Sequence, residues 1–578
     1  MAMSKIIVVG GGLAGLMTTI KIAEAGGDVD IFSVVPVKRS HSVCAQGGIN
    51  AAKNTKGEGD SVEKHFDDTL YGGDFLANQE LPKRMCEKAP EIIDLLDRMG
   101  VMFNRTQEGN IDLRRFGGTL YHRTAFAGAT TGQQMLYALD EQTRRYEVAG
   151  RVKKYEHWEF LSLLKDNKGV CRGIVAMNLQ DMGVKAFKAD AVVLATGGCG
   201  LIFGRSTNST ACTGSASSIA YQQGVYYANG EFIQVHPTAI PGEDKLRLMS
   251  ESARGEGGRV WTYRDGKPWY FLEEWYPKYG NLVPRDVASR AIFKVVKEMG
   301  LGVNGEDVVY LDLSHIDSQL LDVRLGGIIE IYEKFIGADP RKVPMKIFPA
   351  VHYSMGGLWV DNNHMTNVSG LFAVGECDYQ YHGANRLGAN SLLSCLFGGT
   401  VAGPSALAYA QGLEKSTASF PDALFESEVR KQISVHQRLI ASKGSENPFK
   451  LHQELGRLMT DYVTVIRYNK NLEKVDEGIQ KLLERYQNIS LSDKSQWANP
   501  VIPFAIQLYN MLHLARAITM GALKRDESRG SHFKPDFPKR NDQDFLKTTK
   551  AIWSPDGPKI EYEKVDTRYI QPRERKYT

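Results

Sequence analysis

Side chains that bind anions and move protons recur in five short motifs between residues 236 and 386 of this 578-residue chain. Arginine grips carboxylates through paired hydrogen bonds and histidine adds further donors, so together these groups suit a dianionic substrate. Taken singly each has an ordinary explanation, and spacing alone does not show that they converge. The candidates are His236 in "QVHPTAIPG", Ser250, Glu251 and Arg254 in "SESARGEGG", Arg285 and Arg290 in "VPRDVASRA", His352 in "AVHYSMGG" and Arg386 in "HGANRLGANSLL".

Another histidine, His41, lies in the polar, glycine-broken stretch "KRSHSVCAQGGINAA", Lys38–Ala52. This stretch follows a phosphate-binding fingerprint by about one βαβ unit. A histidine in such a loop is commonly only solvated or capping a turn. The residues by themselves therefore leave the role of His41 open.

The fingerprint is "GGGLAG", Gly10–Gly15, whose first, third and sixth residues fill the GxGxxG pattern. The β-branched run Ile6–Val9 predicts a buried strand before it, while Leu16–Ala25 predicts a helix and Val29–Ser33 a second strand. This order is much more specific than the glycines alone. It indicates a tight turn where a pyrophosphate can approach the helix amino terminus closely.

The fingerprint leaves the nucleotide open, because Ser33 stands where an acidic residue usually binds the ribose. Two further short strand patterns, within Ala189–Gly200 and Gly370–Cys377, also end in glycine. Three such strands far apart in sequence suggest one nucleotide crevice, built by a chain that leaves the domain and returns. The segment between them, about 241–349, is then an inserted domain, and its stretch Pro268–Pro284 is too aromatic and irregular for a doubly wound sheet.

Composition excludes several classes of protein. With 42% hydrophobic and 24% charged residues the chain is typical of globular proteins, and a net charge of +4 is too small at this length to indicate nucleic-acid binding. The seven cysteines are dispersed and form no CxxC pair, so no zinc or iron–sulfur ligand pattern is present and we predict no metal. An odd number of dispersed cysteines fits a reducing compartment.

Membrane and export signals are not evident in the sequence. The apolar run near the amino terminus is short and ended by glycine, unlike a signal peptide. No run approaches the roughly 20 apolar residues of a membrane span. We therefore expect a cytoplasmic chain whose membrane contact comes through a partner.

After Ala402 strand patterns nearly vanish and apolar residues follow helical spacing, as in Leu451, Leu455, Leu458 and Tyr462, or Leu508, Leu512 and Ala515. This helical domain should end near Lys524, before a polar segment and a basic stretch expected to form a surface tail. The expected fold is α/β. Its predicted parts are a Rossmann-like nucleotide-binding domain (1–240 and 350–405), an inserted α+β capping domain (241–349), a helical domain (406–524) and a C-terminal segment (525–578).

Nine motifs in order, spread over essentially the whole chain, resemble the flavoprotein subunit family of succinate dehydrogenases and fumarate reductases. They are "GGGLAG", "RSHSVCAQGGINAA", "RRFGGT", "TGGCG", "HPTAI", "SESARGEGGR", "PRDVASR", "HYSMGG" and "HGANRLGANSLL". The chain is most similar to the Bacillus-type, menaquinone-linked branch, whose membrane anchor is a single dihaem cytochrome b subunit. The resemblance identifies the nucleotide as FAD.

The resemblance also assigns a role to His41. In this family the matching histidine carries FAD through a covalent bond to the flavin 8α-methyl carbon, whereas L-aspartate oxidase lacks a histidine there. Ser215 departs from the family pattern, since some relatives have aspartate at this position, so its contact with FAD is left open. The FAD-binding positions implied are Gly10, Gly11, Gly12, Leu13, Ala14, Gly15, Ser33, Lys38, Arg39, Ser40, His41, Ser42, Ala45, Gln46, Gly47, Gly48, Ala195, Thr196, Gly197, Glu376, Arg386, Ser391 and Leu392.

The same resemblance implies how succinate and fumarate are bound and interconverted. Arg285 matches the residue that moves the proton, with Arg254 and Glu251 as its relay, while hydride passes between substrate and FAD. Arginine is normally never deprotonated, so its role as a base is unusual, whereas in fumarate reduction it is simply an acid. The substrate-binding positions implied are His236, Ser250, His352, Arg386, Phe116, Gly47 and Gly48.

Family membership implies partners as well. Electrons would leave FAD for an iron–sulfur subunit docked on the dihaem cytochrome b anchor, which exchanges them with menaquinone. The chain would then lie on the cytoplasmic side of the cell membrane, peripherally. Three alternatives stay open: fumarate reduction as the physiological direction, an L-aspartate oxidase-like enzyme, and a flavin-containing assembly module without turnover of its own.

Overall fold

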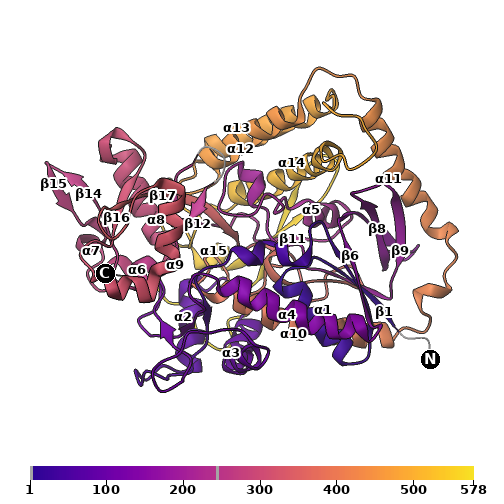
Figure 1. Cartoon of the computed structure of the whole chain (residues 1–578). Helices are drawn as coiled ribbons and strands as arrows, with labels where there is room; N and C mark the ends of the chain where they lie inside the picture. Colours follow the sequence, from indigo (N-terminus) through magenta and orange to yellow (C-terminus); the bar gives the residue numbers. More distant parts are fainter. Residues whose placement is uncertain (1–3, 243–245, 578) are drawn as a thin grey trace.

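The computed structural model describes residues 4–242 and 246–577 (Figure 1). At its centre is a five-stranded sheet in the order β19-β10-β1-β2-β6, in which every neighbouring pair is parallel. Its strands are β1 (Lys5–Val9), β2 (Asp28–Ser33), β6 (Val152–Glu156), β10 (Ala191–Leu194) and β19 (Leu371–Ala373). The three glycine-ended strands expected to share one sheet, β1, β10 and β19, are adjacent in it.

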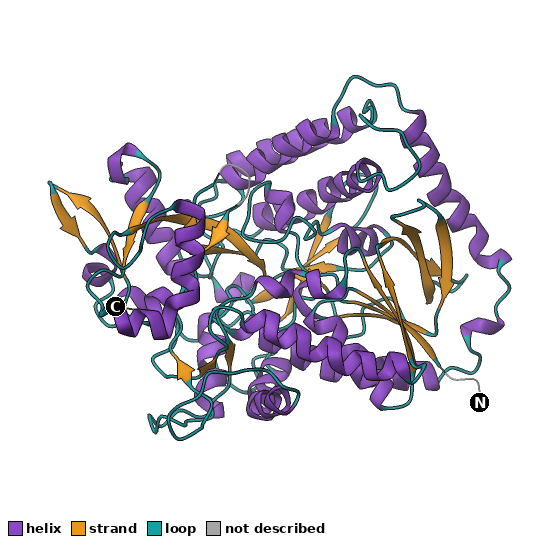
Figure 2. Ribbon diagram, viewed as in Figure 1, coloured by secondary structure: helices purple, strands orange, loops and turns teal. Residues whose placement is uncertain are grey.

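The two faces of this sheet are covered differently (Figure 2). Ile6 and Val8 of β1 join a core with the helices α1 (Leu13–Glu24), α4 (Thr131–Val148) and α10 (Asn390–Gln411). Ile7 and Val9 point the other way, into a core shared with an antiparallel sheet of β7 (Trp158–Lys165), β8 (Cys171–Asn178) and β9 (Val184–Lys188). Alternation along a continuous apolar strand thus buries both faces, as a parallel sheet requires.

A second domain is built on a six-stranded sheet in the order β13-β12-β17-β16-β14-β15. The strands are β12 (Ile233–Ile240), β13 (Arg247–Leu248), β14 (Arg259–Arg264), β15 (Lys267–Trp269), β16 (Val309–Asp312) and β17 (Met345–Ser354), all paired antiparallel. The helices α6 (Ser252–Gly255), α7 (Phe271–Trp275), α8 (Arg285–Phe293) and α9 (Ser318–Ile336) accompany it around a core of its own. Figure 1 shows this capping domain in rose, beside the parallel-sheet domain.

The capping domain remains joined to the parallel-sheet domain through two long strands. β12 starts at Ile233, ahead of residue 241, and β17 runs on to Ser354, past residue 349. The boundaries at 241 and 349 stay predictions. Both strands carry candidate site residues at these crossings, so the junction of the two domains lies at the site.

A layer of helices covers the part of the molecule away from the capping domain, at the upper right of Figure 1. It contains α11 (Ala423–Ala441), α12 (Pro448–Tyr462), α13 (Asn469–Tyr486) and α14 (Val501–Lys524), and α14 ends at Lys524 as expected. The predicted apolar faces are buried at Leu451, Leu455, Leu508, Leu512 and Ala515, each 0% exposed. Two predicted members are not: Leu458 is half-buried and Tyr462 is 39% exposed.

Two helices, α10 and α14, are long and apolar enough to span a membrane by length and composition. We expected no such segment. Most of the apolar stretch of each is buried inside the protein, α10 against α1 and α14 among the helices of its own layer. Both are core helices here.

The remaining elements complete the two domains and the loops around the site. Short antiparallel strands β3 (Ile49–Asn50), β4 (Leu113–Arg114) and β5 (Thr124–Ala125) form one small sheet. Another contains β11 (Tyr227–Ala228) and β18 (Gly357–Leu358). The other helices are α2 (Val62–Gly72), α3 (Glu80–Arg98), α5 (Ser215–Gln222) and α15 (Asp542–Phe545).

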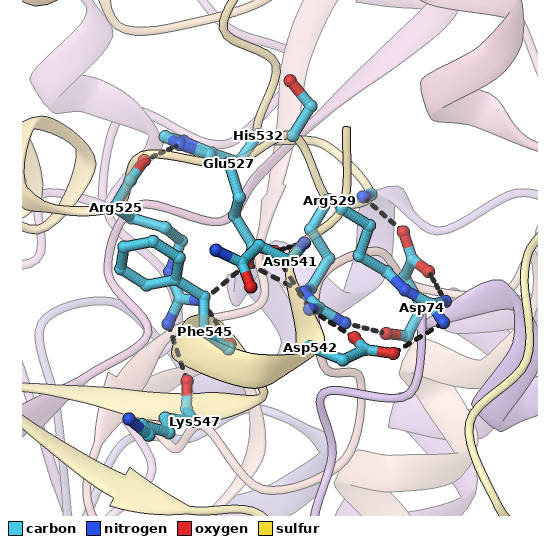
Figure 3. A network of polar contacts seen from close by, with 12 residues as sticks. Asp74, Arg525, Glu527, Arg529, His532, Asn541, Asp542, Phe545 and Lys547 are labelled. Carbon is cyan, nitrogen blue, oxygen red and sulfur yellow. Dashed lines mark hydrogen bonds and ion pairs between the residues drawn. The ribbon is translucent and has the colours of Figure 1, made fainter. Parts of the chain in front are cut away.

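The C-terminal segment differs from expectation. Two strands that we did not predict, β20 (Lys547–Ile552) and β21 (Lys559–Lys564), extend the β18-β11 sheet. Residues 525–534 of the polar segment before them are buried or half-buried, with Arg525 and Glu527 both 0% exposed, whereas residues 536–539 are exposed. Figure 3 shows how these charges satisfy one another: Arg525 bonds Glu527 and the carbonyls of Phe545 and Lys547, and Arg529 bonds Glu527 and Asp542.

The basic stretch at the end lies mostly on the surface, with the side chains of Arg568 and Arg573 60% and 46% exposed, but it is anchored to the protein at two residues. Arg575 is buried in an ion pair with Asp286 of the capping domain, 2.9 Å away, and Tyr577 is 7% exposed. Tyr577 packs edge-on against Tyr71 of α2 and Tyr279 of the capping domain. Paired charges and aromatic rings therefore tie this stretch to both domains, which charge composition alone could not reveal.

Candidate active site

One cavity of about 1170 Å³ connects the glycine loop of the parallel sheet with the cationic motifs of the capping domain. Gly10–Ala14, Ser33 and Ala195–Gly197 line one end, at the carboxyl ends of the parallel strands, where open α/β sheets bind ligands. Phe116, His236, Ser250, Glu251, Arg285, His352 and Arg386 line the other end. Among the predicted site residues, Gly15, Lys38, Arg39 and Arg254 do not line the cavity.

The glycine loop is required by packing as well as by a ligand. Gly10 has φ +119°, and a Cβ there would lie 2.0 Å from the carbonyl oxygen of Ala195. A Cβ on Gly15 would lie 1.9 Å from the carbonyl oxygen of Gly10. Gly15 thus contributes by letting α1 start directly against β1, although it does not line the cavity. The N-cap residue of α1, Gly12, has no side chain to cap the helix, and the backbone N–H of Leu13 donates to Ser42 Oγ at 3.2 Å. An N-terminus that its own N-cap leaves open suits a phosphate.

The unused polar atoms around this end of the cavity fit a dinucleotide. Ser40 Oγ, Gln46 Oε1 and Thr196 Oγ1 are buried, line the cavity and have no hydrogen-bond partner among the residues that the structure describes. Buried polar groups are normally hydrogen-bonded, so these atoms are suited to a ligand. Ser391 and Leu392, at the start of α10, line the same cavity.

His41 lies in a short 3-10 turn, His41–Cys44, and its side chain lines the cavity. The backbone N–H of Ser209 donates to Nδ1 at 3.2 Å, and Nδ2 of Asn208 lies 3.1 Å from Nε2. Asn208 also donates to the carbonyl of His352, at 2.9 Å. The ring is thereby oriented from the segment that follows β10, and the His41 loop is linked to β17.

Arg114 holds the neighbouring loop from behind. It is 1% exposed, and its guanidinium donates to the carbonyls of Gln46 and Gly47. A Cβ on Gly47 would lie 2.7 Å from Cζ of Phe116, so the loop and this ring are in close contact. Gly47, Gly48 and Phe116 accordingly form one wall of the cavity.

Glu251 is the anionic centre of the arginine cluster. It accepts hydrogen bonds from Nε and Nη2 of Arg285, at 2.8 and 2.6 Å, and from Nη2 of Arg254, at 2.8 Å. Burial alone would raise the pKa of Glu251, but the adjacent Arg285 and Arg254 guanidiniums hold it below its ordinary value. Arg254 lies behind Glu251, where it also donates to the carbonyls of Asn281 and Val283.

Arg386 lies on the other side of Arg285 and is 2% exposed. Its guanidinium carbon is 4.5 Å from the centre of the Tyr353 ring. Burial, together with the positive charge of Arg285, lowers the pKa of Arg386 to about 9, and its Nε has no partner within the protein. A carboxylate ligand would satisfy this nitrogen and favour the charged guanidinium.

Two histidines face each other across the same end of the cavity, with ring centres 5.0 Å apart. Burial and then the Arg285 charge keep the pKa of both His236 and His352 well below the ordinary value, so both rings are neutral. Nδ1 of His236 accepts from the backbone N–H of Thr238 at 3.2 Å. The ring hydrogen is therefore on Nε2, which is buried, has no partner and is available as a donor.

Three positive guanidiniums, those of Arg254, Arg285 and Arg386, surround the single buried carboxylate of Glu251. Two positive charges are left over, which a dianion would balance. Ser250, 1% exposed, adds a hydroxyl at this end of the cavity. The arrangement suits a small dicarboxylate placed next to the nucleotide end.

Two further positions named from the sequence, Glu376 and Ser215, also lie on the cavity wall. Glu376 lines the cavity, accepts from the backbone N–H of Ser354 at 3.0 Å and has its pKa raised by burial to about 7. Ser215 also lines the cavity, and its hydroxyl accepts from Asn510 of α14 at 2.9 Å. Within residues 4–242 and 246–577, no group of three or more His, Cys, Asp or Glu side chains could hold a metal ion.

Three positioning residues were missed from the sequence: Arg114, Asn208 and Gln234. Arg114 and Gln234 occur inside quoted motifs, "RRFGGT" and "QVHPTAIPG", so motif membership was an available signal. Nothing local distinguishes their side chains from surface ones. Their partners lie far away along the chain.

Known proteins resemble this chain over its full length. Residues 5–392 match the FAD binding domain family, and residues 452–577 match the fumarate reductase flavoprotein C-terminal family. The succinate dehydrogenase flavoprotein subunit of Bacillus subtilis is 65% identical over 580 residues, with 100% of this chain and 99% of that one covered. The fumarate reductase flavoprotein subunit of Haemophilus influenzae is 36% identical, with 99% and 96% covered.

The chain belongs to the succinate dehydrogenase flavoprotein subunit family. It is an FAD-dependent oxidoreductase and the flavoprotein subunit of complex II, a membrane-bound assembly. The fold, the family and FAD as cofactor, all expected from the sequence, are confirmed.

Solved structures agree with this assignment. An Escherichia coli quinol fumarate reductase subunit has a TM-score of 0.91 at 33% identity, covering 99% of this chain and 98% of that one. Mycobacterium smegmatis Sdh1, solved in complex with UQ1, has a TM-score of 0.82 at 30% identity, covering 97% and 95%. The parallel-sheet domain, the capping domain and the helical layer are therefore the architecture of this family.

Proposed function

We propose that the chain interconverts succinate and fumarate, with one substrate carboxylate held by Arg386 and His352 and the other by His236 and Ser250. The observation that carries this proposal is the excess of two buried positive charges around Glu251. These charges lie at one end of the cavity, and the glycine loop lines its other end. A succinate dianion balances that charge and spans the two binding groups. The neutral Nε2–H of His236 supplies a donor without adding a third charge.

Arg285 is the proposed proton-transfer residue. It lines the cavity, and Glu251 connects it to Arg254 behind, through hydrogen bonds of 2.6 to 2.8 Å. In fumarate reduction the charged Arg285 guanidinium gives a proton to one substrate carbon and regains one through Glu251 and Arg254. Succinate oxidation is the reverse, so Arg285 first loses a proton through the same relay and then takes one from a methylene carbon. Phe116 and the Gly47–Gly48 wall exclude water from this end, which strengthens every charge interaction there.

FAD, when bound, supplies the acceptor and donor of the hydride. The glycine loop, the His41 loop, Thr196 and Glu376 would hold it, and we propose a covalent bond from the His41 imidazole to its 8α carbon. The position of His41 on the cavity wall supports this proposal. Acid-denatured protein should keep a yellow chromophore, and His41→Ala should release it. Free FAD from the denatured parent chain would contradict the covalent bond.

The partners of the flavoprotein within complex II are proposed from its 65% identity to the Bacillus subtilis subunit. They are an iron–sulfur subunit that takes electrons from FAD, and a dihaem cytochrome b anchor that exchanges them with menaquinone. The chain would then lie on the cytoplasmic side of the membrane without crossing it. Purification of the complex with its haem and iron content tests this.

Turnover of succinate with an artificial electron acceptor tests the proposed chemistry, using the intact complex. Arg285→Ala should abolish flavin reduction by succinate. Arg290→Ala is the matched control, because Arg290 lies on the same helix α8, does not line the cavity and is partly exposed. Equal activity of the two variants would refute the role of Arg285. No turnover by the flavinylated parent complex would favour an assembly module, and turnover of aspartate an L-aspartate oxidase-like enzyme.

The physiological direction is proposed to be succinate oxidation, on the same identity to a succinate dehydrogenase subunit. Fumarate reduction uses the same residues. Rates in both directions with the membrane quinone distinguish the two.

A further inference from the structure

Gln234 lies directly behind the two arginines that face the substrate end of the cavity. It belongs to β12, is 0% exposed and does not line the cavity, whereas Arg285 and Arg386 both do. Its Oε1 accepts from Nη1 of Arg285 at 2.9 Å and from Nη2 of Arg386 at 2.8 Å. One amide oxygen therefore connects the two guanidiniums.

The orientation of this amide is fixed from its other end. Nε2 of Gln234 donates to Oδ1 of Asn385 at 3.0 Å and to the backbone carbonyl of Arg386 at 2.8 Å. Asn385 Nδ2 donates in turn to the carbonyl of Gly72, so its Oδ1 is the atom turned toward Gln234. All four contacts of the amide are used, and exchanging its nitrogen and oxygen would break every one.

The choice of a neutral acceptor has an electrostatic consequence. Two guanidiniums that approach one point repel each other, and an oxygen between them offsets that repulsion. Glu251 already neutralises one charge on the other side of Arg285. A second carboxylate would cancel one of the two positive charges available to a dianion, whereas an amide holds both arginines and leaves their charge unchanged.

The backbone around Gln234 is irregular at this point. The pairing of β12 with β17 changes register between Gln234 and Val235 and again between His236 and Ala239. Register shifts of this kind re-aim side chains next to active sites. One irregular strand thus directs Gln234 toward the pair of arginines and His236 into the cavity that these arginines line.

We propose that Gln234 is a positioning residue that sets the spacing and orientation of Arg285 relative to Arg386. The inference rests on the proposed function, in which Arg386 holds a substrate carboxylate and Arg285 moves the proton. Gln234 contacts neither substrate nor cofactor. It acts by keeping the proton-transfer group at a fixed place over the carbon atoms of a dicarboxylate held by Arg386. Misplacement of such a group by about 1 Å can cost about a hundredfold in rate.

Three variants of the intact complex test this inference. Gln234→Met keeps the length of the side chain and removes the shared oxygen, and Gln234→Glu keeps the oxygen and adds a charge. Gln380→Met is the matched control, since Gln380 is a 3% exposed glutamine that bonds only the carbonyl of Val360 through Nε2 and does not line the cavity. The measurements are kcat and KM for succinate, the pH profile, and the dissociation constant of malonate from flavin absorbance.

Gln234→Met should lower kcat about 10- to 100-fold and weaken malonate binding about tenfold, while Gln380→Met stays within about twofold of the parent. Gln234→Glu should weaken malonate binding about a hundredfold or more, because the new carboxylate behind the two arginines repels the malonate dianion. It should also change the pH profile of succinate oxidation, since it places a second carboxylate within hydrogen-bond distance of Arg285.

The outcomes separate this inference from the proposed function. A parent complex whose flavin succinate does not reduce would overturn the proposed function. If the parent is active but Gln234→Met matches Gln380→Met in kcat and malonate binding, the positioning role is wrong and the proposed function stands. Loss of folding alone would lower the flavin content of the methionine variants without moving the pH profile of Gln234→Glu. That result would also overturn the inference.

Discussion

Replacement of Arg575 by methionine should loosen the capping domain, although Arg575 lies 289 residues from its partner Asp286 in the sequence. Its guanidinium donates to both oxygens of Asp286, at 2.9 and 3.1 Å, and lies 3.6 Å from Asp74. Asp286 follows Arg285 directly on α8. Figure 1 shows the end of the chain beside α6 and α7 of the capping domain. The ion pair thus ties the C-terminal segment to the helix that presents Arg285.

The size of the effect follows from burial. The side chains of Arg575 and Asp286 are only 8% and 1% exposed. Burial would raise the pKa of Asp286, but Arg575 and Arg290 keep it below the ordinary value, so the carboxylate is charged. Removing the buried partner of such a charge costs about 3 to 5 kcal/mol, and the loss should fall at the lower end because Arg290 remains 3.3 Å from Asp286. Arg573 is a control from the same stretch, because its pair with Asp67 is 46% and 36% exposed and is worth at most about 1 kcal/mol.

The assay is urea unfolding of the complex, combined with limited proteolysis of the capping domain and succinate turnover. We expect Arg575→Met to lower the unfolding midpoint, speed cleavage and reduce turnover, and Arg573→Met to leave all three nearly unchanged. Adding Asp286→Asn to Arg575→Met should recover part of the lost stability, because no unpaired charge then remains buried. Equal midpoints and equal turnover for Arg575→Met and Arg573→Met would refute the reasoning.

Three further predictions follow from single contacts. Glu251→Gln should lower kcat about a hundredfold or more while malonate still binds, because the proton relay is lost and Arg386 remains; kinetics and a malonate titration check this. Gly15→Ala should yield protein without flavin, since its Cβ would lie 1.9 Å from the Gly10 carbonyl oxygen, whereas Gly326→Ala in α9 meets nothing within 4 Å; the ratio of flavin to protein absorbance decides. Burial raises the pKa of Asp378 from 3.8 to about 8, so the folded state keeps a proton that the unfolded chain releases, and stability falls as pH rises from about 4 to 8; Asp378→Asn should therefore stabilise the chain more at pH about 8.5 than at about 5.5.

Local pattern was enough for the elements around the nucleotide end. The run Ile6–Val9, the glycines after it and the helix expected from Leu16, which begins at Leu13, were predictable because strand burial, turn geometry and helix formation depend on neighbours in sequence. The same holds for α14, which ends at the predicted Lys524. The ordered motifs also indicated the family, since each motif is a local string.

Only the tertiary structure decided how those pieces act together. Gln234 bridges to Arg386 across 152 positions, Asn208 to His41 across 167 and Arg575 to Asp286 across 289. A polar residue in a sequence carries no sign of whether it meets water or a buried charge far along the chain, so Arg575 reads as part of a solvated tail until the fold surrounds it. The sequence alone thus determined the parts and the cofactor class. Burial, which makes each charge depend on its partner, decided the arrangement of the arginines and the fate of the C-terminal segment.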